Sequence, residues 1–273
     1  MKQFVSSPKW LGVFLAAVVL SVAAYIIDVL VSEVSPGNIW GFSFGTAAAV
    51  LFFGAALYGV RRRSVKFSSR MGLGRVQTWM QFHLYGGALF LLLMFMHTGF
   101  SLPHGALNWA LWALSIWVTL SGLLGVLLQK WTAQALSSGL EIEVIYERIP
   151  ELSDELRSRA ETLVPTAPES VRRFYERDLA LKLQKPARSL RYFVDISGGA
   201  HQIARAFDHL KQALASDNAK IADELEEIYR AKLALDAHFT MQAALRAWLI
   251  LHLPLSLVLI LLALLHLFVV FYY

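Results

Sequence analysis

The sequence predicts an all-α integral membrane protein: a bundle of five transmembrane helices with a mostly helical insertion between the fourth and the fifth. Of the 273 residues, 56% are hydrophobic and only 16% are charged, which is too apolar for an ordinary soluble domain. Five stretches also reach the roughly 20 residues that a helix needs to cross the hydrocarbon core. They are residues 10–32, 40–60, 76–100, 107–129 and 245–271.

These stretches set the predicted domain organisation. Residues 1–129 hold the first four transmembrane helices, residues 130–244 form the insertion, and residues 245–273 hold the fifth helix. The first stretch starts at Trp10 behind Lys2 and Lys9, as a signal peptide would, but it continues without a clear small-residue cleavage site. We therefore expect it to be a retained transmembrane helix.

Basic residues predict how the bundle is oriented. The connection after the second stretch carries six of them and no acid: Arg61, Arg62, Arg63, Lys66, Arg70 and Arg75. Short basic loops stay in the cytoplasm, so we expect a multi-pass protein of the inner (cytoplasmic) membrane. Its N-terminus and the 130–244 insertion would be cytoplasmic and its C-terminus outside.

Because residues 131–243 hold 15 basic and 18 acidic residues, the net charge of +5 comes from the membrane part. It does not indicate nucleic-acid binding.

The insertion reads as a mainly helical soluble domain. Residues 141–146 alternate like a short strand, whereas 151–164, 168–184 and 200–215 are predicted helices. From Ala219 the apolar residues recur at helical spacing, and no Gly or Pro intervenes before Pro254. One helix is therefore expected to continue from the insertion into the last transmembrane stretch. The insertion contains no Gly-rich phosphate loop and no nucleotide fingerprint.

Two pairs of histidines are the main functional signal. His83 and His97 lie fourteen residues apart in the third stretch, as do His252 and His266 in the fifth. Fourteen residues are nearly four helical turns, so the members of a pair share one face and lie about 21 Å apart along the axis. The third and fifth helices both run outward in the predicted topology. His83 is therefore level with His252 near the inner face, and His97 is level with His266 near the outer face.

Imidazoles at matched depths on two parallel helices suit a haem, because one imidazole can bind each axial face of the iron. Burying four imidazoles in hydrocarbon with nothing to bind would cost free energy at each of them. The chain has no cysteine, which excludes a thiolate-bound iron–sulfur cluster, a c-type haem and a disulfide in this chain. We therefore expect two haem b groups, with His83/His252 and His97/His266 as the axial pairs.

Neighbouring residues fit this interpretation. Gly86 and Gly87 follow His83 by one turn, where a porphyrin edge needs the backbone close by. Arg75 and Arg246 lie one or two turns toward the cytoplasm from the inner histidines, within reach of haem propionates. The alternatives are helix packing for the glycines and contact with lipid headgroups for the arginines. The other small residues of the second and fourth stretches are interpreted as packing positions: Gly41, Gly45, Gly54, Gly59, Ser121, Gly122 and Gly125.

The segments from Phe82 through Gly99 and from His252 through His266 resemble the bis-histidine dihaem core of membrane b-type cytochromes. Placement on the third and fifth helices is most similar to the ferric-reductase and NADPH-oxidase core. The spacing is also similar to that of the cytochrome b subunits of respiratory complexes. The resemblance implies the same axial pairs. Unlike that core, this protein is expected to have no flavin or nicotinamide domain after Tyr273 and no sixth helix, and its insertion is an addition.

We therefore expect a dihaem cytochrome b subunit that carries electrons across the membrane, an electron-transfer subunit of an oxidoreductase complex rather than a complete enzyme. Its expected partners are iron–sulfur, flavin or c-type cytochrome subunits, with quinone as a further candidate and membrane lipid around the helices. The alternative is a quinone-reactive membrane anchor of a respiratory dehydrogenase or reductase. A metal-ion transporter or a structural anchor fits less well, because the transmembrane stretches carry no acidic residue besides Asp28 and the histidine spacing is paired.

Overall fold

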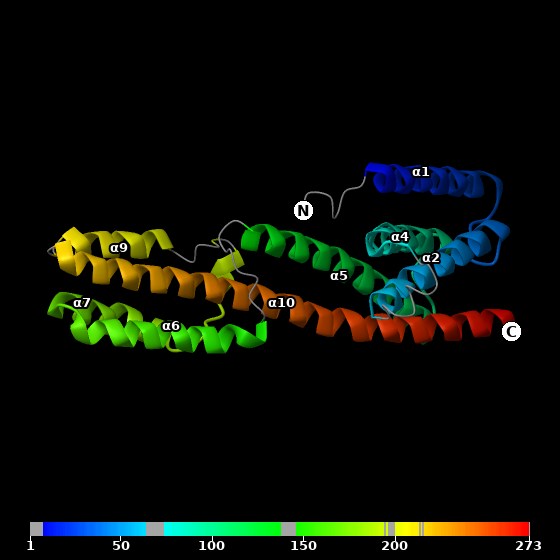
Figure 1. The fold of residues 1–273 in the computed structure, drawn as a ribbon. Coiled ribbons are helices and arrows are strands. Elements are labelled where there is room, and N and C mark those ends of the chain that lie inside the picture. Colours follow the sequence, from blue (N-terminus) through cyan, green and yellow to red (C-terminus); the bar gives the residue numbers. More distant parts are fainter. Residues whose placement is uncertain are drawn as a thin grey trace. The chain divides into compact units, whose positions relative to one another are not determined.

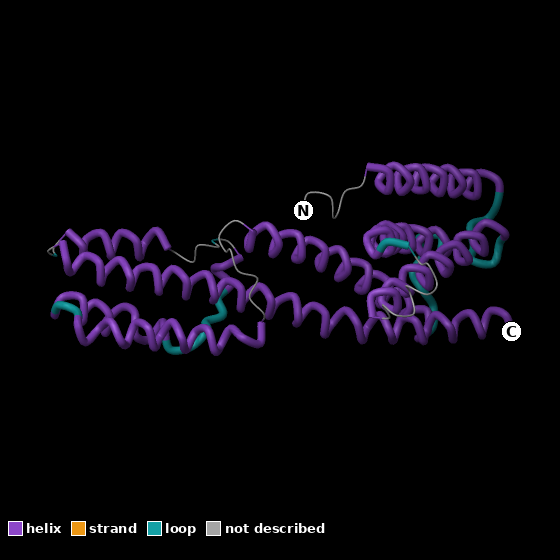
Figure 2. Tube along the Cα trace, viewed as in Figure 1, coloured by secondary structure: helices purple, strands orange, loops and turns teal. Residues whose placement is uncertain are grey.

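The computed structural model describes residues 8–63, 74–137, 146–193, 195, 200–212, 214 and 216–272. Every regular element in these ranges is a helix and none is a strand (Figures 1 and 2), so the all-α prediction is confirmed. The chain forms two compact units. One comprises residues 1–124 with 250–273, and the other comprises residues 125–249. The predicted boundaries at 129/130 and 244/245 stay predictions.

Five helices are long and apolar enough to cross a membrane, as the sequence predicts. They are α1 (Pro8–Val31), α2 (Ile39–Arg63), α4 (Val76–His97), α5 (Ala106–Ser137) and α10 (Ser216–Tyr272). Many of their large apolar side chains are exposed, among them Leu20, Leu30 and Ile250. Apolar surface of this extent is suited to contact with lipid. The helix α10 is continuous through Pro254, which confirms that one helix runs on from the insertion.

Packing of α4 against α2 fixes where the α4 histidines lie. The α4 helix packs mainly on α2 and, less extensively, on α1. The contact is built around Phe44 and Ala48 of α2 with Phe90, Leu93 and Met96 of α4. Gly54 brings the two backbones close, because a Cβ at this position would lie 2.9 Å from the ring of Phe82. These contacts set the register of α4 along α2.

A glycine turn ends α4 directly after His97. Thr98 caps the helix: its N–H donates to the carbonyl group of Met94, and the N–H of Gly99 donates to that of Met96. Gly99 then adopts φ +59°, a left-handed conformation that favours glycine. A Cβ on Gly99 would also lie 2.7 Å from Cγ1 of Val34. The helix is therefore shorter than the predicted 76–100 stretch, and His97 is its last residue.

In the second unit, short helices pack on the first half of α10 (Figure 1). They are α6 (Ile149–Leu163), α7 (Glu169–Phe174), a π-helical turn (Tyr175–Leu179), α8 (Ala180–Leu183) and α9 (Ala200–Gln212). Phe207, Leu225 and Val171 are buried in their shared core. The strand predicted over 141–146 falls on residues outside the described part of the chain, except Tyr146, which begins a 3₁₀ turn.

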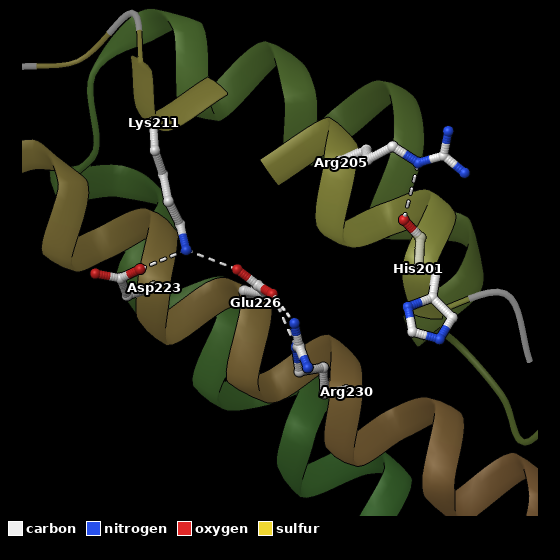
Figure 3. A network of polar contacts seen from close by, with 6 residues as sticks. All are labelled: His201, Arg205, Lys211, Asp223, Glu226 and Arg230. Carbon is white, nitrogen blue, oxygen red and sulfur yellow. Dashed lines mark hydrogen bonds and ion pairs between the residues drawn. The ribbon is translucent and has the colours of Figure 1, made fainter. Parts of the chain in front are cut away.

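Ion pairs connect the elements of this unit. Lys211 of α9 lies 2.5 Å from Asp223 and 2.6 Å from Glu226 of α10, and Arg230 also binds Glu226 (Figure 3). Burial raises the pKa of Glu226, but the hydrogen bonds from Lys211 and Arg230 outweigh it and the net pKa is lowered. Farther along α10, the buried Lys232 ammonium donates to both carboxylate oxygens of Asp236. These pairs hold α9 and the segment after α8 against α10.

Candidate haem-ligand sites

All four histidines predicted as ligands lie in the same compact unit. His83 and His97 are on α4, His252 and His266 are on α10, and each is half-buried. The ring centroids of His97 and His266 are 6.5 Å apart, with an angle of 79° between the ring planes. The imidazoles of His97 on α4 and His266 on α10 thus face each other.

Backbone carbonyl groups of α2 hold both α4 imidazoles. Nδ1 of His83 lies 2.8 Å from the carbonyl oxygen of Ala55, and Nδ1 of His97 lies 2.8 Å from that of Gly41. A carbonyl oxygen only accepts, so each Nδ1 carries a proton, and in the neutral form of the ring the lone pair is on Nε2. Histidines that bind metal commonly have this arrangement, because the second nitrogen then fixes the tautomer and the ring orientation.

The α2 backbone matches the ligand spacing, since Gly41 and Ala55 are fourteen residues apart, as are His83 and His97. At the Gly41 end the imidazole is pressed against the helix. A Cβ on Gly45 would lie 2.7 Å from Nδ1 and 2.9 Å from Cε1 of His97, which is closer than carbon atoms pack in proteins. Only a glycine at position 45 lets His97 reach the carbonyl group of Gly41.

A serine of α5 holds the first α10 imidazole. Nδ1 of His252 lies 2.8 Å from Oγ of Ser121, and the hydroxyl of Ser121 lies 3.0 Å from the carbonyl oxygen of Val118. When the hydroxyl donates to Val118, its oxygen accepts from Nδ1 of His252, which gives this ring the same tautomer as His83 and His97. A Cβ added at Gly122 would lie 3.5 Å from Cε1 of His252. Thus α5 also supports the site.

The donor set fits a haem. With metal–nitrogen bonds of about 2 Å on each side, two axial imidazoles are expected to have centroids about 6 Å apart; the His97–His266 pair has this separation. In the described residues, no three or more His, Cys, Asp or Glu side chains form a group that could hold a bare metal ion. Two imidazoles suffice for a haem, because the porphyrin supplies the other four nitrogen ligands.

The remaining predicted site residues have mixed surroundings. Gly86 is buried and its Cβ position is within 3.9 Å of Phe82 and Leu51, so it faces α2, whereas the Cβ position of Gly87 has no atom within 4 Å. Arg75 is exposed directly before α4. Contact of these residues with a haem stays a prediction.

Arg246 belongs to the other compact unit. Its guanidinium forms an ion pair with Glu147 and lies 4.0 Å from the ring centroid of Tyr146. The hydrogen bond from Arg246 lowers the pKa of Glu147. The side chain thus has partners within its own unit, and its proposed contact with a propionate stays a prediction.

Three other histidines lie in the unit formed by residues 125–249. His201 and His209 are exposed on α9. His238 is 4% exposed, and neither of its ring nitrogens has a hydrogen-bond partner. Burial disfavours its charged form and lowers its pKa. In the described part of the chain, none of the three belongs to a group of three or more His, Cys, Asp or Glu side chains that could hold a metal ion.

The sequence did not single out the groups that support the ligands. The sequence predicts Gly41, Gly45 and Ser121 as packing positions, and nothing in it marks Ala55. One signal was present: Gly45 and Gly59 repeat the fourteen-residue spacing on the second helix, each four residues after a carbonyl group that binds a histidine. Comparison of the chain with family models, with curated proteins and with solved structures gives no match.

Proposed function

We propose that this chain is a dihaem b-type cytochrome of a membrane and that it carries electrons from one face of the membrane to the other. The observation that carries the proposal is the set of hydrogen bonds that the imidazoles make through Nδ1. His83, His97 and His252 each have Nδ1 at 2.8 Å from an oxygen of a neighbouring helix, which leaves Nε2 as the ligating atom. His97 and His266 also have the separation expected of an axial pair.

The chain would hold one haem between His83 and His252 and another between His97 and His266. When bound, such a group supplies one-electron chemistry at its iron. The residues orient the ligands: acceptors at Nδ1 make the imidazoles more basic, which favours the higher oxidation state of a bound metal. Fourteen residues of helix, about 21 Å, separate the two sites along α4. That distance spans most of the roughly 30 Å hydrocarbon core, so electrons would pass from one site to the other across the membrane.

The basic connection between α2 and α4 supports a cytoplasmic location for the N-terminus and for the 130–244 insertion. The His83/His252 site is then the inner one and the His97/His266 site the outer one. We infer that partners at both faces exchange electrons with the chain: an iron–sulfur, flavin or c-type cytochrome subunit, or a quinone. The insertion, with its mixed charge and its helices, is suited to docking a cytoplasmic subunit.

The first experiment is a visible spectrum of the purified protein. Two haems per chain are expected, with the α, β and Soret bands of low-spin haem b in the reduced-minus-oxidised difference spectrum. Protein that is expressed with sufficient haem and is nevertheless colourless would overturn the proposal.

Single ligand variants then test the pairing. His83→Ala or His252→Ala should remove the inner haem, and His97→Ala or His266→Ala the outer haem, because each iron loses one of its two axial ligands. His209→Ala is the matched control, since His209 is exposed and lies in the other unit; it should retain both haems. Haem content by pyridine haemochrome assay is the measurement. A ligand variant that keeps two haems with an unchanged low-spin spectrum would contradict the pairing.

A further inference from the structure

A carboxyl group is buried in the membrane unit close to the end of α1. Asp28 is fully buried, and its Oδ2 atom has no hydrogen-bond partner. No Lys or Arg occurs between Lys9 and Arg61, so the sequence offers no nearby cation from α1, from the following connection or from most of α2. Burying an ionisable side chain in a membrane helix costs free energy. Such a residue therefore usually has a function, with a partner that can be named.

A chain of hydrogen bonds leads from Asp28 to the ligand His97. The hydroxyl of Ser32 donates to Oδ1 of Asp28, and Nδ2 of Asn38 donates to the same oxygen at 2.9 Å. Oδ1 of Asn38 accepts from the backbone N–H of Gly41 at 2.6 Å. Finally, the carbonyl oxygen of Gly41 accepts from Nδ1 of His97 at 2.8 Å. Three helices thus contribute to one network: α1, the start of α2 and the end of α4.

Further contacts fix the network at Asn38 and at Gly41. Nδ2 of Asn38 also donates to the carbonyl oxygen of Glu33 at 3.0 Å, which fixes the side-chain amide between α1 and α2. Gly41 packs closely against the connection, since a Cβ at this position would overlap the carbonyl oxygen of Ser35. The position of the Gly41 carbonyl group, and with it the orientation of the His97 ring, therefore depends on Asn38 and on the carboxylate that anchors Asn38.

We propose that Asp28 is a positioning residue for His97: it anchors Asn38 and Gly41 and, in its ionised form, lowers the reduction potential of the haem bound by His97 and His266. This inference rests on the proposed function. The physical reason is that a nearby anion stabilises ferric haem, which carries one more positive charge than ferrous haem. At the other site, the hydrogen bonds of the described residues lead from His83 to the carbonyl group of Ala55 and from His252 to the hydroxyl of Ser121, and neither acceptor is a carboxyl group. The effect should thus be confined to one haem.

The test is a potentiometric titration of the purified dihaem protein. Asp28→Asn removes the charge at constant size, and it should raise the potential of the His97/His266 haem while the other haem keeps its potential. The two potentials are assigned from the ligand variants, each of which retains one haem. Glu33→Gln is the matched control: it removes the same charge five residues away, but the Glu33 side chain is exposed and takes no part in the network. Both potentials should stay unchanged in it.

A second variant tests positioning apart from charge. Asn38→Leu keeps Asp28 but breaks the link to Gly41, so the His97 ring should turn. The near-perpendicular rings of His97 and His266 should give a highly anisotropic low-spin EPR signal, and Asn38→Leu should shift this signal. If Asp28→Asn proves poorly stable, Asp28→Glu serves as a further variant. It retains the carboxyl group, so the His97/His266 haem should keep the wild-type potential.

The outcomes separate this inference from the proposed function. Wild-type protein without haem would refute the proposed function. Wild-type protein with two haems, together with unchanged potentials in Asp28→Asn or an equal shift of both haems, would refute only the role of Asp28.

Discussion

Single residues hold three of the four candidate ligands in different ways. His83 and His97 bind backbone carbonyl groups, whereas His252 binds the hydroxyl of Ser121. A backbone acceptor leaves no mark in the sequence, because every residue has a carbonyl group. The histidines themselves could be predicted from their spacing and from the scarcity of polar groups around them. Their acceptors could not, since which carbonyl group lies beside each ring depends on the register of α4 against α2.

Ser121→Ala should weaken the haem site formed by His83 and His252. The substitution removes the acceptor for Nδ1 of His252 while leaving the ligand in place. Loss of such a supporting hydrogen bond typically lowers metal affinity by about 10–100-fold. The measurement is the rate of haem transfer from the purified protein to an excess of apomyoglobin, with the two haems resolved by their spectra.

Ser115→Ala is the control for Ser121→Ala. Ser115 is also buried on α5, but six residues of helix turn it about a third of a circle away from Ser121. Haem transfer should be as slow as in the wild type. Equal haem loss in both variants, or in neither, would argue against support of His252 by Ser121.

At the scale of elements, length and hydropathy predicted the five long helices, because a span of about 20 apolar residues leaves few alternatives. The details were set by contacts that the pattern does not contain. The α4 helix ends at His97 through the Thr98–Gly99 turn rather than at residue 100. The helix predicted over 168–184 is divided by the π-helical turn Tyr175–Leu179, where one extra residue per turn changes the register of its buried face.

The contact between α2 and His97 yields a sharp test of the element packing. Gly45→Ala places a Cβ where the His97 ring now lies, 2.7 Å from Nδ1, so the ring must move and the outer haem should be lost. Haem content should fall from two per chain to one, as measured by pyridine haemochrome assay. The inner haem should keep its spectrum, because His83 binds α2 fourteen residues away.

Gly59→Ala is the matched variant. Gly59 follows the acceptor Ala55 by four residues, as Gly45 follows Gly41, but its Cβ position has no atom within 4 Å. Alanine also suits a helix better than glycine does, by about 0.5–1 kcal/mol. Both haems should therefore be retained. Loss of the inner haem in Gly59→Ala would show that the imidazoles are not placed as described.

For the whole molecule, the sequence predicted a membrane protein with a soluble, helical part, and the described residues have five helices that suit a membrane. The orientation of those helices follows from loop charge alone, because the packing within a bundle is the same whichever face is cytoplasmic. Orientation therefore requires a measurement on cells.

The cysteine-free chain makes that measurement direct. Single cysteines are introduced at two exposed positions, His104→Cys between α4 and α5 and Ser158→Cys on α6. A membrane-impermeant maleimide added to intact spheroplasts should label position 104, and it should label position 158 only after permeabilisation. The parent chain, without cysteine, is the control for background labelling. The reverse pattern would exchange the inner and outer haems, and equal labelling of both positions would mean that α5 does not cross the membrane.

The use of backbone acceptors by α2 also affects how the protein tolerates random mutation. Any small residue at position 55 would still present a carbonyl group to His83. Most single-base changes in the codon for residue 55 should therefore leave this hydrogen bond intact. Support for His252 depends on a side chain, and among the other amino acids only threonine offers a comparable hydroxyl acceptor at position 121. Inherited defects in this proposed site should therefore concentrate on α5 rather than on α2, although both helices hold a candidate ligand of that site at the same 2.8 Å.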